Sequence, residues 1–363
     1  MGLEKGKVSS LGLVLLLFLF IFGSVIAIPG STAGKDIWLA RILSFMIALP
    51  LAGVFIALLN RYQGKTIIEI NEIIFGPIPG GFLSGIFLWY LFHNGALVVM
   101  YYFEFIKQVL LPNTPANVLV LMMVAPCIYG AKKGLEVIVR TGQLIAPILL
   151  GTFIMLIFLA MPDIEISNIK PLFTTPLHKF LWGGVSTAAL SFGETAAFLM
   201  ILPFLNKKGK VKITLLSGLL LGCIVMVLST LRTILILGDS AGLYLYPTYY
   251  AVKMIDIAEF LSRFEILIAV NYLAAGFIKT TVYLYALSLG TAQLFKLDSY
   301  HPLVLPWGFL MALFSLINLP NIIEKLDFAN KAYPIYALPF ILGIPLLALL
   351  GSWLKGLKGG DAQ

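Results

Sequence analysis

The chain has 363 residues, of which 60% are hydrophobic and only 12% are charged. A soluble domain of this length carries about twice that charge, so the composition excludes a soluble globular protein and indicates a membrane protein. The net charge of +8 would suit a nucleic-acid partner, but the distribution of the basic residues has another explanation.

Ten apolar stretches follow one another, each near the ~20 residues needed to cross a bilayer. They are Val8–Gly34, Ile42–Asn60, Ile73–Phe103, Gln108–Ala131, Thr141–Pro162, Phe180–Asn206, Ile213–Leu231, Ile266–Phe295, Ser299–Ile323 and Ala332–Leu354. The loops between them are short. The sequence therefore predicts an all-α polytopic membrane protein with ten transmembrane helices and one membrane domain over residues 1–363. A long first apolar core with nine more spans after it favours a retained helix over a cleaved signal peptide.

The basic residues predict the orientation. With the N-terminus in the cytoplasm, ten spans return the C-terminus to the same side, and fourteen of the 25 Lys and Arg residues lie there. They are densest between Lys207 and Lys212. This is the excess of basic residues expected of cytoplasmic loops. Orientation in a lipid bilayer accounts for the positive charge, and we expect no nucleic-acid partner.

The ten spans divide into two halves of five, about 8–162 and 180–355. Because five is odd, the second half is inserted upside down relative to the first. The opening span of each half is interrupted, at Gly23 and Ser24 in the first and at Ser191–Thr195 in the sixth. Matched interruptions in inverted halves indicate a binding site at the membrane midplane. Each glycine alone is also compatible with a helix-packing role.

Interrupted helices leave backbone groups that a zwitterionic amino acid can satisfy. We expect the carboxylate of such a ligand at the N-terminal end of the outer half of span 1, beginning near Gly23 and Ser24. Its ammonium suits carbonyls near Ser191 and Phe192 in span 6. Gly193 supplies the backbone freedom that this arrangement requires.

Two charged residues lie deep inside predicted spans. Glu194 is near the middle of span 6, and Lys279 lies sixteen residues past Arg263, about 24 Å along a helix. Ionisable residues at this depth are functional candidates. Glu194 could instead be a structural carboxyl. Lys279 could pair with Glu194, take the place of a bound cation, or reach a water-filled cavity.

Further candidates come from helix periodicity. Asn94 and Tyr101 are seven residues apart, and Thr281 and Tyr285 are four apart, so each pair shares a helix face. Interhelical hydrogen bonding is the alternative for all four residues. No catalytic constellation or metal-ligand spacing stands out, so we expect no enzyme, no metal and no cofactor.

Charged residues near the predicted outer ends of spans are not expected to have a functional role. Glu104, Arg232, Arg263 and Glu265 are expected to reach the surface or to form surface ion pairs. The external loop Gly238–Ser262 contains either a short interfacial helix or an aromatic-rich loop.

Three motifs resemble one family. They are Ser191–Thr195 in span 6, Ser262–Glu265 at the start of span 8, and Phe277–Tyr283 within it. With the length and the ten spans, the whole chain resembles the B subunits of spore germinant receptors, which are endospore germination permeases of the amino acid–polyamine–organocation superfamily. Tyr272 departs from the pattern, in which a Trp is expected.

The resemblance implies a leucine-transporter-type fold and a receptor function. Such a subunit would bind a nutrient, often an amino acid, and would act with an A-type membrane subunit and a C-type lipoprotein in the spore inner membrane. Two alternatives stay open. The first is a proton- or sodium-coupled amino-acid transporter of the same fold, and the second is an ion-conducting subunit of the receptor complex.

Overall fold

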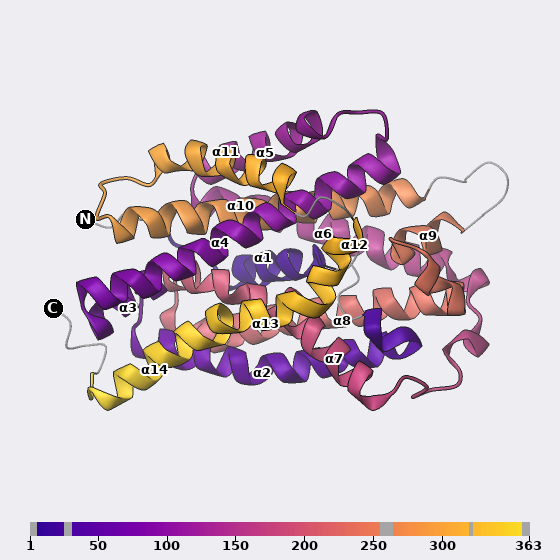
Figure 1. Cartoon of the computed structure of the whole chain (residues 1–363), viewed down its shortest axis with the longest axis horizontal. Helices are drawn as coiled ribbons and strands as arrows, with labels where there is room; N and C mark the ends of the chain where they lie inside the picture. The colour runs from indigo at the N-terminus through magenta and orange to yellow at the C-terminus, as the bar shows by residue number, and fades with distance from the viewer. Residues whose placement is uncertain (1–5, 25–30, 255–263, 319–321, 358–363) are drawn as a thin grey trace.

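The computed structural model describes residues 6–24, 31–254, 264–318 and 322–357. Within these ranges every regular element is a helix, and one isolated bridge joins Val8 to Leu205. The helices run roughly parallel to the long axis of the molecule (Figure 1). This confirms the all-α prediction, and it is the arrangement that hydrocarbon demands, because helices satisfy their own backbone groups.

The predicted spans correspond to helices in the described residues. Six are long and apolar enough to cross a membrane, and three shorter apolar helices accompany them. A composite of α7 with two irregular turns supplies the sixth span. In chain order the spans are α1 (Ser10–Phe22), α2 (Ile37–Arg61), α4 (Pro77–Phe105), α5 (Ala116–Lys132), α6 (Leu135–Leu159), α7 (Leu177–Thr187) with η5 (Ala188–Phe192) and η6 (Gly193–Met200), α8 (Val211–Leu237), α10 (Glu265–Leu294), α11 (His301–Ile317), and the tenth span, Ile322–Leu354.

The tenth span and the loops contain shorter elements. The tenth span consists of α12 (Ile322–Asp327), η10 (Phe328–Ala332), α13 (Tyr333–Leu338), η11 (Pro339–Gly343) and α14 (Ile344–Leu354). Two short helices lie in loops, α3 (Ile67–Phe75) and α9 (Pro247–Lys253). The residues of α9 that are buried include Tyr249 and Val252, so this short helix packs on the protein.

The packing of the spans has the symmetry of two inverted halves. α1 packs against α8, and in the corresponding pair of the other half α7 packs against α2. The pair α10 and α5 likewise corresponds to the pair α4 and α11, and both are in contact. Spans 2, 3 and 4 each pack against their own counterparts, α8, α10 and α11. Exchanging each span for the one five positions later therefore maps these contacts onto one another.

The two interrupted spans differ in detail. α1 ends at Phe22, and the Ser24 N–H donates to Ile21 O at 2.9 Å. The predicted outer half of span 1 falls mainly on residues 25–30, outside the described residues. Span 6 keeps helical backbone angles through Gly193 but changes from a π-helix in η5 to a 3-10 helix in η6. Its interruption is thus a change of hydrogen-bond pattern, a feature that often marks functional sites, whereas the sequence suggested an unwound segment.

One end of the bundle gathers segments from both halves. The Lys7 N–H donates to Glu136 at 3.2 Å, and Arg61 Nε donates to Leu357 O at 2.7 Å. The start of α1 therefore lies beside the start of α6, and the end of α2 lies beside the end of α14, whereas α9 is at the opposite end of the molecule from α14 (Figure 1). Contacts at the far end include the Glu165 N–H, which donates to Leu235 O at 3.0 Å.

We predict that reporters placed after Lys208 and near Lys170 will lie on opposite sides of the membrane. The 27 residues of α8 separate these positions by about 40 Å, and the basic cluster at Lys208 should stay in the cytoplasm. Fusion of a cytoplasm-active and an exterior-active enzyme at each site is the measurement. Finding both positions on the same side would contradict the inverted arrangement.

Candidate functional site

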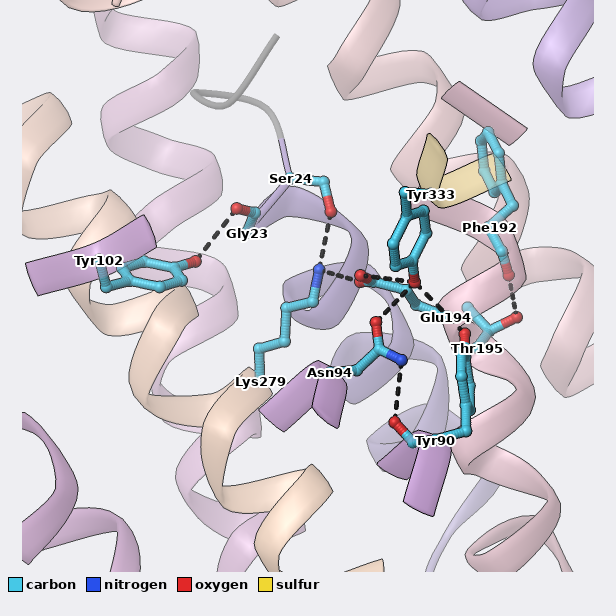
Figure 2. Close-up of polar contacts among 10 residues, drawn as sticks. All are labelled: Gly23, Ser24, Tyr90, Asn94, Tyr102, Phe192, Glu194, Thr195, Lys279 and Tyr333. Atoms are coloured by element: carbon cyan, nitrogen blue, oxygen red, sulfur yellow. Dashed lines mark hydrogen bonds and ion pairs between the residues drawn. The ribbon is translucent and has the colours of Figure 1, made fainter. Parts of the chain in front are cut away.

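A buried ion pair lies at the centre of the bundle. Lys279 of α10 and Glu194 of η6 are in direct contact and are only 3% and 4% exposed. Lys279 Nζ also donates to Ser24 Oγ at 2.8 Å and lies 5.1 Å from the centroid of the Phe20 ring. Spans 1, 6 and 8 meet at this ammonium group (Figure 2). Of the alternatives for Lys279, the structure favours the pairing with Glu194.

Polar groups from two further spans surround the carboxylate. The Tyr333 hydroxyl lies 3.3 Å from Glu194 Oε1 and 2.6 Å from Asn94 Oδ1. Asn94 Nδ2 donates to Tyr90 O at 2.9 Å, and the Tyr90 hydroxyl is 3.4 Å from that of Tyr333. The network extends the charge pair to α4 and α13 (Figure 2). Such buried polar groups hold their side chains in place because an unpaired group would be costly.

The end of α1 is fixed by close packing. Tyr102 Oη donates to Gly23 O at 3.1 Å, and its ring stacks on Tyr272 with 4.1 Å between the centroids. A Cβ on Gly23 would lie 2.6 Å from Tyr102 Oη, and one on Gly276 would lie 2.1 Å from the Tyr102 ring. Both glycines are therefore required by the position of one tyrosine.

A cavity opens beside the ion pair. The centres of water-sized molecules could occupy about 70 Å³ of it, which is room for roughly five waters or for a small amino acid. Apolar and aromatic side chains form most of its wall. The lining residues are Gly23, Ser24, Leu97, Val98, Tyr101, Tyr102, Leu190, Glu194, Leu245, Tyr246, Tyr272, Lys279, Leu326, Ala329 and Asn330.

The structure brings several sequence-predicted residues together. Gly23, Ser24, Tyr101 and Glu194 line the cavity with Lys279. Asn94 lies behind them, in the network with Tyr333.

The other predicted residues of span 6 surround the break without lining the cavity. Ser191 is fully buried, and a Cβ on Gly193 would lie 2.6 Å from Ile341 Cδ1. Phe192 O accepts a hydrogen bond from Thr195 Oγ1 at 2.5 Å, so this carbonyl is already engaged.

Thr281 and Tyr285 do not belong to this group. Thr281 Oγ1 donates to Phe277 O at 2.6 Å, and its side chain lies against Gly130 of α5. The Tyr285 ring packs edge-on against Tyr300 at 5.4 Å. Thr281 is two residues past Lys279 and is therefore about 200° away around the helix. Both side chains are engaged in packing between helices. The prediction that they contribute to a ligand site is therefore wrong for this cavity.

Sequence reasoning selected Tyr101 as a site residue but missed Tyr102 and Tyr272. Tyr272 is seven residues before Lys279 and Gly276 is three before it, so both share its helix face. Tyr102 follows Asn94 by eight residues on α4 in the same way. These spacings were available in the sequence, whereas the contact between Tyr102 and Gly23 depends on the tertiary arrangement.

The charged residues that were expected at the outer ends of spans are more buried than predicted. Lys325 Nζ and Glu104 Oε1 form an ion pair at 2.5 Å, with side chains 5% and 18% exposed. Arg232 is 3% exposed and Glu265 is 8% exposed, which corrects the surface assignment for these residues. Arg263 lies outside the described residues.

Comparison with known proteins identifies the family. A family model described as "Spore germination protein" matches residues 7–328. The chain belongs to this spore germination family. It is 28% identical over 360 residues to spore germination protein KB of Bacillus subtilis (strain 168), covering 97% of this chain and 96% of that protein.

Solved transporter structures share the fold. Mhp1, a nucleobase-cation-symport-1 family transporter solved in a closed conformation with bromovinylhydantoin bound, superposes with a TM-score of 0.74 at 14% identity, covering 98% of this chain and 80% of that one. A Na⁺-coupled sialic acid symporter gives 0.64 at 14% identity, covering 97% and 82%. The fold is thus the leucine-transporter type, with two inverted halves and interrupted spans 1 and 6. Family and fold together point to a non-enzymatic, multi-pass membrane protein.

We predict that the buried charges compensate each other. Glu194→Gln leaves the Lys279 ammonium unpaired, and Lys279→Met leaves the carboxylate unpaired, so each change should destabilise the protein by about 3–5 kcal/mol. The double variant removes both charges and should recover part of the loss. Thermal unfolding of the purified variants, with membrane protein level as a second readout, measures this coupling. Strictly additive losses would mean that the two side chains act independently.

Proposed function

We propose that the chain is the nutrient-binding transmembrane subunit of a spore germinant receptor and that its ligand is a small amino acid. The observation that carries this proposal is the small central cavity, mostly apolar in its walls, whose charged residues Lys279 and Glu194 sum to zero. A cavity without surplus charge favours a ligand that is neutral overall, because an unpaired ionic ligand would be costly there.

A zwitterion would use both ends of the ion pair. We place its carboxylate toward Lys279 Nζ and Ser24 Oγ, and its ammonium toward Glu194. This choice replaces the carbonyls near Ser191 and Phe192 as the ammonium partner, because neither residue lines the cavity. The ligand side chain would then lie among Leu97, Val98, Leu190, Leu326 and Ala329. Such walls favour aliphatic side chains of limited size.

Signalling requires that the ligand shift an equilibrium between two conformations. In the proposed receptor, an A-type membrane subunit and a C-type lipoprotein in the spore inner membrane bind the two conformations unequally. Linkage then requires the partners to change the ligand affinity by the same factor by which the ligand changes theirs. We propose that both termini lie on the cytoplasmic side, as the basic residues favour.

We predict that Gly23→Leu abolishes amino-acid binding while the protein still inserts into the membrane. The new side chain would occupy the space of Tyr102 Oη, 2.6 Å from a Cβ at this position. Gly151→Leu is the matched control, because a Cβ on this exposed glycine of α6 has nothing within 4 Å. Calorimetric titration of the purified proteins with the common amino acids measures the effect. Unchanged affinity in Gly23→Leu would remove the central cavity from the proposal.

We predict that the isolated subunit binds its ligand without concentrating it and without needing sodium. The Lys279 ammonium supplies a fixed positive charge between Ser24 and Glu194, where a coupled transporter could hold a mobile cation. Replacing sodium by choline should change the affinity less than twofold, and proteoliposomes under an imposed sodium or proton gradient should show no uptake. Robust gradient-driven uptake would instead support a coupled amino-acid transporter.

A further inference from the structure

A second, larger cavity lies on the side of the bundle that holds α9 and α12. The centres of water-sized molecules could occupy about 450 Å³ of it. It shares Leu245, Leu326 and Asn330 with the central cavity, so the two adjoin. Its walls come from the first turns of α2, the last turns of α8, and the irregular segments η1 (Ser31–Asp36) and η9 (Gly238–Leu243).

The charged residues of this outer cavity do not balance. Lys35 pairs with Asp239 at 2.8 Å, and Lys331 pairs with Asp327 at 2.9 Å. Arg41 is the fifth charged residue of the lining. Among the described residues it has no acidic partner within ion-pair distance, so the cavity carries one surplus positive charge.

Arg41 is also short of hydrogen bonds. It is 3% exposed, and its Nε and Nη1 atoms have no hydrogen-bond partner among the residues that the structure describes. A guanidinium group stays charged at every physiological pH, so it cannot lower the cost of its burial by losing a proton. A buried charge is retained when a counter-charge satisfies it. The sequence placed Arg41 outside span 2, whereas α2 includes it as a buried residue.

The surroundings of Arg41 favour an organic anion. The planar guanidinium group matches the two oxygens of a carboxylate. Thr248 adds a hydroxyl to the same cavity, whereas the hydroxyls of Thr230 and Thr233 there already donate to Met226 O and Ser229 O. Ile37, Ile234 and Pro247 add apolar wall. The cavity is also far larger than a bare halide ion, with room for roughly thirty waters.

We propose that Arg41 forms a second binding site, in the outer cavity, for the carboxylate of a small organic acid. This site is separate from the central cavity and does not depend on the proposed receptor function. Because the carboxylate neutralises the surplus charge of Arg41, binding stabilises the folded protein.

Propionate and its uncharged isostere propionamide are suitable probes. The purified full-length protein in nanodiscs is heated with each compound over a concentration series at constant ionic strength. We expect propionate to raise the unfolding midpoint with saturation and propionamide to leave it unchanged. Sodium chloride at the same concentrations is the control for an inorganic anion, and it should not raise the unfolding midpoint in the same way. Equal unfolding midpoints with propionate and propionamide would mean that water alone solvates Arg41. An equal shift with chloride would indicate a general anion site instead of a carboxylate site. Either result would overturn the proposal.

Two variants distinguish binding at Arg41 from general electrostatic attraction by the other charged residues of the cavity. Arg41→Met should weaken propionate binding at least tenfold, and without propionate its unfolding midpoint should equal or exceed that of the natural protein. The double variant Lys331→Met, Asp327→Asn is the matched control, because it removes an ion pair of the same cavity and leaves the net charge unchanged; it should keep the affinity within twofold. An equal loss in both variants would contradict a site at Arg41. If Arg41→Met does not fold, Arg41→Gln and the probe comparison on the natural protein decide the question.

The proposed outer site can be tested independently of the proposed central site. Gly23→Leu, which blocks the central cavity, should keep the midpoint shift with propionate. Loss of that shift in Gly23→Leu would place the carboxylate in the central cavity and overturn the outer site.

Discussion

The contact between Lys279 and Glu194 is the interaction on which the centre of this protein depends. Each charge alone would be expensive in a low-dielectric interior, and together they are tolerated because further polar groups surround them. The ammonium bonds Ser24 of span 1, and the carboxylate adjoins Tyr333 of span 10, which bonds Asn94 of span 3. One ion pair therefore sets the relative positions of five spans that are distant in the sequence.

Small residues determine how closely those spans approach. Tyr102 lies between Gly23 and Gly276, and its hydroxyl donates to Gly23 O just past the end of α1. Glycines at helix contacts let backbones and large rings pack without an intervening Cβ. The same tyrosine forms part of the cavity wall. The packing of Tyr102 thus also shapes the cavity, whose wall here follows from the contact between α1, α4 and α10.

The fold was largely predictable and the site only in part. Apolar runs delimit spans because hydrocarbon tolerates few charges, and the paired interruptions at Gly23 and Gly193 follow from the same logic. Glu194 and Lys279 were recognisable one by one, but 85 residues separate them, and their contact depends on tertiary packing. Thr281 was wrongly assigned to the ligand site because it lies about 200° around the helix from Lys279, and the prediction did not consider this angle. Arg41 was excluded from span 2 because a sequence pattern treats a charge as a boundary, whereas the protein buries it beside a cavity.

The two adjoining cavities solve the problem of buried charge in different ways. In the central cavity the cation is balanced by a carboxylate of the chain itself, so the space beside it favours ligands without net charge. In the outer cavity Arg41 has no such partner among the described residues, and we propose that a carboxylate from solution supplies its counter-charge. Binding energy to a buried charge depends on what neutralises it. Under the two proposals, the charge balance within each cavity selects the class of ligand: a molecule without net charge in the central cavity and an anion in the outer one.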